Sequence, residues 1–139
     1  MPKITIIDNE YASLWFYPES RIVHHQIHKF MRKGLYQELV TAGVECLEKH
    51  SATKWLSDNR GNPVVRHQDI HWATTVSLPR AMRAGFKYWA IVMPAKEIGK
   101  MQMRELIDEL GGRGIAVKAF ADPDDAMRWL ESVDKAVKK

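Results

Sequence analysis

The spacing of hydrophobic and polar residues changes near residue 30 of this chain. Before that point, short runs rich in β-branched and aromatic residues alternate with turn residues, at 3–8, 11–17 and 21–28. Short runs of this kind around a breaker such as Pro18-Glu19-Ser20 are typical of hairpins. The pattern therefore predicts an antiparallel unit at the start of the chain.

After residue 30 the apolar positions follow the period of a helix. Leu35, Leu39, Ala42 and Cys46 lie at i, i+4, i+7 and i+11, which is one face of a helix over 31–49. Further helices are predicted over 67–84, from Ile98 to Leu110 and from Asp122 onward, with strands between them at 53–58, 87–93 and 115–120.

Proline, glycine and aspartate set the boundaries of these elements. Pro79 lacks an amide hydrogen and clashes with the preceding turn, so it must kink or split the second helix. Gly85 suits the end of that helix. Asp122 before Pro123 is a strong helix start, because aspartate caps free amides and proline fits the first turn. The apolar run 87–93 suits a central strand that is covered on both faces.

The order of elements, β-β-β-α-β-α-β-α-β-α, predicts an α/β fold in a single domain over 1–139. Strands that alternate with helices imply right-handed crossovers and a largely parallel sheet. Because the chain opens with a hairpin, the sheet is expected to be mixed. We therefore predict an N-terminal antiparallel hairpin followed by βα repeats, with the helices packed on the sheet.

Composition narrows the classes of protein. The chain is 45% hydrophobic and 27% charged, as globular proteins are, and acidic residues are interspersed among the basic ones despite a net charge of +4. This pattern lacks the basic stripe of a nucleic-acid binder. Cys46 has no partner for an internal disulfide. Charge appears too early for a signal peptide, and no apolar run approaches the roughly 20 residues that cross a bilayer. We expect a cytoplasmic protein with no transmembrane segment and no nucleic-acid partner.

The end of the strand at 53–58 is the first candidate binding site. Asp58, Asn59 and Arg60 follow it, and ligands of open α/β sheets bind beyond the carboxyl ends of strands. Arg60 could hold an anion through its planar fork. The alternative is that Asp58 and Arg60 form an internal ion pair or cap the next helix. Asp69 and Trp72 on that helix complete the predicted site.

Histidines offer a second kind of site. His67 and His71 stand four apart, the spacing used by zinc peptidases, but Gln68 replaces the glutamate that such enzymes use as a base. His24 and His28 are predicted on one face of a strand and His25 on the other. For His67 and His71 we favour a partly exposed helix start with one or both histidines hydrogen-bonded, and for the other cluster a polar sheet face or an interface. We therefore predict no metal, no cofactor and no catalytic residue.

Five tryptophans are many for this length: Trp15, Trp55, Trp72, Trp89 and Trp129. Core packing is the ordinary role of such residues. Tryptophans that gather at one exposed place would instead indicate an interface or an apolar pocket.

The chain from about 50 to 135 resembles the bacterial STAS/SEC14-like domain family, also called SpoIIAA-like. The shared pieces are Trp55, Asp58-Asn59-Arg60, Trp72, Pro79-Arg80-Ala81, Gly85, the strand 88–94, Asp125-Ala126 and Trp129-Leu130. The resemblance implies a mixed sheet with helices. It also implies a regulatory role, since some members are switched by phosphorylation of a serine after an aspartate. Ser57 precedes Asp58, so this phosphorylation site is not carried over.

Three functions follow as hypotheses. The first is a non-enzymatic regulatory or protein-interaction module that binds a protein partner or forms a homodimer, with Asp58, Arg60, Asp69 and Trp72 on its surface. The second is a small protein that binds an apolar ligand or lipid, suggested by the many aromatic and methionine residues. The third, which we favour least, is a metal-dependent hydrolase that uses His67 and His71.

Overall fold

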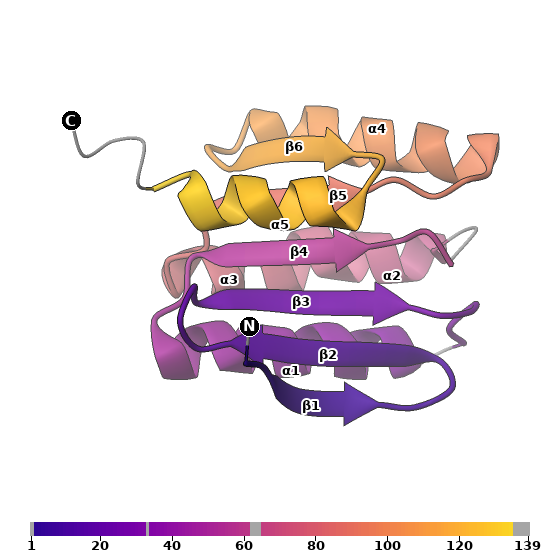
Figure 1. Cartoon of the computed structure of the whole chain (residues 1–139). Coiled ribbons are helices and arrows are strands. Elements are labelled where there is room, and N and C mark those ends of the chain that lie inside the picture. The colour runs from indigo at the N-terminus through magenta and orange to yellow at the C-terminus, as the bar shows by residue number, and fades with distance from the viewer. Residues whose placement is uncertain (1, 33, 62–64, 135–139) are drawn as a thin grey trace.

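The computed structural model describes residues 2–32, 34–61 and 65–134. These residues form one six-stranded sheet whose strands lie side by side in chain order (Figure 1). The strands are β1 (Ile4–Asp8), β2 (Ala12–Tyr17), β3 (Ile22–Ile27), β4 (Lys54–Asp58), β5 (Tyr88–Val92) and β6 (Ala116–Phe120). The predicted α/β class and mixed sheet are confirmed.

Helices follow each strand from β3 onward. They are α1 (Leu35–His50), α2 (His67–Trp72), the π-helix η1 (Ala73–Ser77), α3 (Leu78–Arg83), α4 (Glu97–Gly111) and α5 (Pro123–Ser132). The first helix begins at Leu35 and not near residue 31, because Gly34 has a φ of 91°, outside the helical region. None of the helices built from the described residues has both the length and the apolar character needed to cross a membrane.

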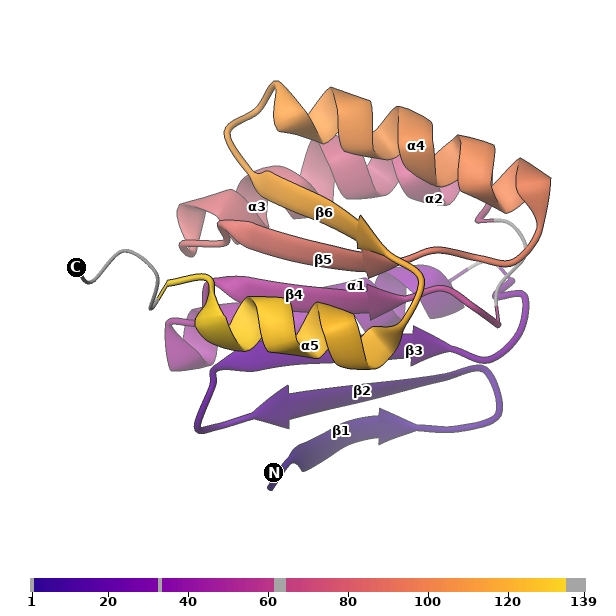
Figure 2. The same cartoon turned by 45° about the horizontal axis from the view of Figure 1, so that its top comes forward.

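The direction of the strands decides which face each helix covers. β1, β2 and β3 pair antiparallel, whereas β3, β4, β5 and β6 pair parallel. Each parallel crossover steps to the next strand in the same direction. Right-handed crossovers of this kind place their helices on one face. Accordingly α1, α2, α3 and α4 lie behind the sheet in Figure 1, and α5 lies in front of it. In the tilted view of Figure 2, α4 appears above the strands and α5 in front of β4.

Successive side chains along a strand point to opposite faces of the sheet, so each face has its own hydrophobic core. On the α1 face, Leu14, Val23 and Trp55 belong to the larger cluster. On the α5 face, Leu56 and Ala90 pack against Leu130 and its neighbours on the helix. β4 is buried along its whole length, and β5 lies between two paired strands. The prediction that 87–93 contains a central strand is therefore confirmed.

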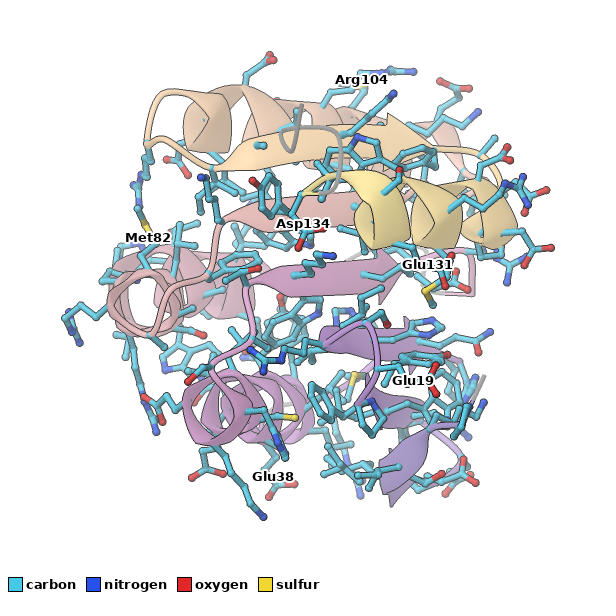
Figure 3. All side chains as sticks on the ribbon, turned by 60° about the vertical axis from the view of Figure 1, so that its left-hand side comes forward. Glu19, Glu38, Met82, Arg104, Glu131 and Asp134 are labelled. Atoms are coloured by element: carbon cyan, nitrogen blue, oxygen red, sulfur yellow. The ribbon has the colours of Figure 1, made fainter. Side chains whose placement is uncertain are left out.

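Polar contacts fix both ends of α5. The side chain of Asp122 accepts a hydrogen bond of 2.8 Å from the Asp124 N–H, which confirms the predicted helix start. Just beyond the helix, Asp134 lies beside the sheet (Figure 3), and its Oδ1 is 3.1 Å from Nζ of the buried Lys54. The helix is thus held over β4 and β5 by charge as well as by apolar contacts.

Candidate functional site

A cavity of about 50 Å³ lies between the sheet and the helices on its α1 face. The sheet contributes His25, Trp55 and Trp89, from three neighbouring strands. The cavity is partly open to solvent and has room for a few water molecules or one small organic group. The other lining residues are Tyr36, Val40 and Val44 of α1, Ala73 and Ser77 of η1, Leu78 and Ala81 of α3, and Phe86.

Hydrogen bonds fix the rings of the sheet wall. The indole N–H of Trp55 donates to Nδ1 of His25 at 2.9 Å, and that of Trp89 donates to Oγ of Ser57 at 2.8 Å. Because an indole only donates, Nδ1 must be the acceptor, so neutral His25 carries its proton on Nε2. Burial, and next the neighbouring His24, lower the pKa of His25 to about 3. This wall is therefore uncharged near neutral pH.

Close packing against a glycine also fixes the position of the Trp55 ring. Its six-membered ring lies against Gly43 in the middle of α1, where a Cβ would stand 2.2 Å from Cη2 of the indole. Real atoms do not approach so closely, so only glycine fits at this position. The close approach of α1 to β4 thereby sets the position of the Trp55 ring in the cavity wall.

The helical wall contains a turn of π-helix. In it the Leu78 N–H donates to the Ala73 carbonyl five residues earlier. Pro79 has no N–H for the next carbonyl of this series, that of Thr74, and Nη1 of Arg113 donates to it at 3.0 Å. The backbone therefore stays helical through this region, with a π turn in place of the predicted kink or split, and an arginine beyond α4 satisfies the freed carbonyl. Such π segments within α-helices frequently occur at functional sites.

Asp69 of α2 is a buried acid close to the cavity. It is 1% exposed, and its Oδ2 has no hydrogen-bond partner among the described residues. One helical turn separates it from Ala73, a lining residue, so both lie on one side of the helix. Burial, and next the charge of Asp69, raise the pKa of Tyr36, another lining residue. Asp69 is not itself among the lining residues, and its charge acts on the cavity wall through Tyr36.

The predicted site at the end of β4 is mostly internal. Asp58 is buried and accepts hydrogen bonds from Nε and Nη2 of Arg60 at 3.0 and 2.8 Å, which is the internal ion pair that the sequence offers as an alternative. Asn59 is also buried and contacts Sδ of Met103 on α4 at 3.5 Å. The Arg60 side chain is 48% exposed.

Trp72 and Asp69 lie in the helical layer, away from the ion pair of β4. Trp72 is partly buried and packs edge-on against Tyr36. Of the five predicted site residues, Arg60 alone is exposed. The structure therefore divides the predicted residues between the carboxyl end of β4 and α2, and none of them lines the cavity.

His67 and His71 are both exposed. His67 lines a groove of about 190 Å³ between α2 and α4, together with Glu105 and Glu109. Within the part of the chain that the structure describes, no three metal-ligating side chains of histidine, cysteine or acid type gather in one place.

Histidines near β3 make internal contacts. Nδ1 of His24 is 3.0 Å from the Tyr17 hydroxyl, and burial lowers the pKa of His24 to about 4. Nε2 of His28 is 2.9 Å from Oγ of Ser13, which donates to Asp8 at 2.8 Å. This arrangement differs from a catalytic triad, in which the imidazole stands between acid and serine. Ser13 is moreover 1% exposed.

Sequence reasoning missed most of the cavity. His25, Tyr36 and Phe86 come from separate elements, and nothing in their local sequence connects them. The high tryptophan content was the one available signal, and it is explained in part, since Trp55 and Trp89 share one wall. Trp129 instead packs beside the α5-face cluster.

A scan against protein-family models and searches of curated proteins and of solved structures find no match to this chain. The resemblance to the STAS/SEC14-like family therefore stays a prediction.

Proposed function

We propose that this protein is a non-enzymatic binding module and that its ligand is a small, largely apolar molecule held in the cavity between sheet and helices. The observation that carries the proposal is the lining itself. Five ring side chains, those of His25, Tyr36, Trp55, Phe86 and Trp89, surround one cavity that is partly open to solvent. Apolar and aromatic walls with few polar groups are typical of small-molecule sites.

The walls are already arranged for binding. Hydrogen bonds orient both indoles, and the contact with Gly43 fixes Trp55. A ligand would therefore not need to order these side chains, which lowers the cost of binding. The volume of about 50 Å³ suits a group of a few heavy atoms and is too small to enclose a lipid chain. At the end of β4, in contrast, Asp58 and Arg60 are engaged with each other and Asn59 contacts Met103.

Binding of xenon and benzene tests this proposal, because both enter apolar cavities. We expect either probe to shift the indole N–H signals of Trp55 and Trp89 in a nuclear magnetic resonance titration. Ala81→Leu, which fills the cavity, should abolish the shifts, whereas Ala95→Leu at an exposed position should leave them unchanged. If the indole signals of the folded wild-type protein do not move with either probe, the proposal is wrong.

Arg60 supports a second candidate function, contact with a protein partner through an acidic group. Two hydrogen bonds from the buried Asp58 hold its guanidinium, while 48% of the side chain stays exposed. Such an oriented guanidinium matches a carboxylate of a partner. Trp72, partly buried against Tyr36, is less accessible than the hypothesis from sequence requires.

The variant Arg60→Lys tests this function, because lysine keeps a positive charge beside Asp58 but lacks the planar guanidinium that can donate two parallel hydrogen bonds. We expect the variant to lose about tenfold in affinity for partners captured by cross-linking in cells, a typical effect of losing one charge-assisted contact. Arg104→Lys on the exposed side of α4 is the matched control (Figure 3). Equal capture by both variants would remove Arg60 from the interaction.

A further inference from the structure

We propose that the hydroxyl group of Ser77 is the polar contact of the cavity, and that the ligand is a small neutral ketone or alcohol whose oxygen hydrogen-bonds to it. This inference rests on the proposed function and names the chemical class of the ligand. Two features carry it. One is the position of Ser77 in the cavity wall, and the other is its hydroxyl group, which has no hydrogen-bond partner among the described residues.

Ser77 lies in the middle of one helical wall of the cavity. Ala73, Ser77 and Ala81 follow one another at intervals of four residues, which places them on one side of the helix, and all three line the cavity. A serine side chain consists of one carbon atom and a hydroxyl group, so a serine that lines a cavity brings its oxygen to the wall. Ser77 is 6% exposed, so its side chain faces the interior and not the outer surface.

The π turn explains why this hydroxyl group is free. Serine and threonine side chains within helices can donate to a carbonyl four residues earlier, and Thr75 does so to the His71 carbonyl at 2.7 Å. The equivalent carbonyl for Ser77 is that of Ala73. It accepts the Leu78 N–H instead, which is the hydrogen bond that makes the turn a π turn. The local helix therefore leaves the Ser77 oxygen available for another partner.

The oxygen of Ser77 is also accessible. Among the described residues, the side-chain atoms that are both sealed from water and without a partner are Nε2 of His24 and Oδ2 of Asp69. The Ser77 oxygen lacks a partner too, but it is not sealed in this way, so a molecule in the cavity can reach it. A polar group without a partner in a buried residue points to a water molecule or a ligand.

The rest of the wall favours a neutral ligand over a charged one. The described lining residues include no lysine, arginine, aspartate or glutamate, and His25 is neutral because burial lowers its pKa to about 3. A charge buried without an opposite charge is costly. One hydroxyl group among five ring side chains therefore matches a molecule with a single hydrogen-bonding oxygen and an apolar remainder.

Acetone and isobutene make a matched pair of probes, because they have similar shapes and differ in one oxygen atom. We expect Ser77→Ala to weaken acetone binding about fivefold, the effect of losing one hydrogen bond between neutral groups, as followed by the Trp55 and Trp89 indole signals. Isobutene binding should stay the same or become tighter, since the variant only removes a polar atom. Ser132→Ala, which removes an exposed hydroxyl group on α5, should change neither.

Crystals of the wild-type protein soaked with acetone test the same contact without a variant. The carbonyl oxygen should lie within hydrogen-bond distance of Oγ of Ser77. A carbonyl that points elsewhere, unchanged acetone affinity of folded Ser77→Ala, or binding of isobutene without any binding of acetone would overturn this inference. Binding of xenon or benzene would in each case still support the cavity as a site, whereas failure of all four probes would overturn both.

Discussion

Replacing Gly43 with alanine is expected to lower the free energy of unfolding by about 3 kcal/mol, the upper part of the usual range for overpacking a core. In the interior of a helix this substitution normally stabilises, by about 1 kcal/mol. Here the added Cβ would stand 2.2 Å from Cη2 and 2.7 Å from Cζ2 of Trp55. The indole cannot retreat easily, because its N–H is bonded to the buried His25. The sign of the effect should therefore be reversed.

Urea unfolding of Gly43→Ala beside Gly111→Ala provides the measurement. Gly111 is also helical, and nothing lies within 4 Å of a Cβ placed there, so its variant should be as stable as the wild type or more so. Adding Trp55→Phe to Gly43→Ala should recover part of the loss by making room, which is a coupling between neighbouring sites. An unchanged or higher stability of Gly43→Ala would show that α1 and β4 approach less closely than described.

Acid is expected to destabilise the protein steeply between about pH 6.5 and pH 3. Burial is the main cause that lowers the pKa of His24 to about 4 and that of His25 to about 3, and Asp58 opposes both shifts. Below pH 6.5 the unfolded chain therefore binds protons that the folded protein does not, so stability falls as the pH falls and levels off below the folded-state pKa values. Each histidine contributes on the order of 3 kcal/mol to this loss.

Urea midpoints at pH 7, 6, 5 and 4 measure this dependence. His24→Phe keeps a ring in place and removes one titrating group, so its midpoint should fall less with acid than that of the wild type. His71→Asn is the matched control, because His71 is exposed. A stability that stays constant from pH 7 to pH 4 would contradict the burial of both imidazoles.

Local patterns were enough to predict the fold class. The change from strand-like runs to helical spacing, and punctuation such as Asp122 and Gly85, are properties of neighbouring residues. They therefore identified nearly every strand and helix to within a few residues. The start of α1 was predicted near residue 31 and lies at Leu35. Apolar spacing does not reveal the backbone of Gly34, whose φ of 91° keeps the helix from beginning earlier.

The cavity could not be predicted in this way. His25 meets Trp55 only because β3 and β4 pair in one particular register, in which Val23 stands opposite Trp55 and His25 opposite Ser57. Gly43 looked like one of many small helical residues, and its importance depends on a ring twelve residues away. Likewise, Arg113 satisfies a carbonyl that Pro79 leaves free on another helix. Such contacts depend on tertiary packing, which a single sequence does not display.

The side-by-side order of the strands also has a consequence for synthesis on the ribosome. Each new strand can pair with the one made just before it, so the sheet can grow at a single edge without rethreading earlier segments. The front of β4 and β5 is different, since Leu56 and Ala90 are covered by Ala126 and Leu130 of α5. Until α5 has left the exit tunnel, the nascent sheet carries a bare apolar front. Shielding of that front by a chaperone would matter most in this interval.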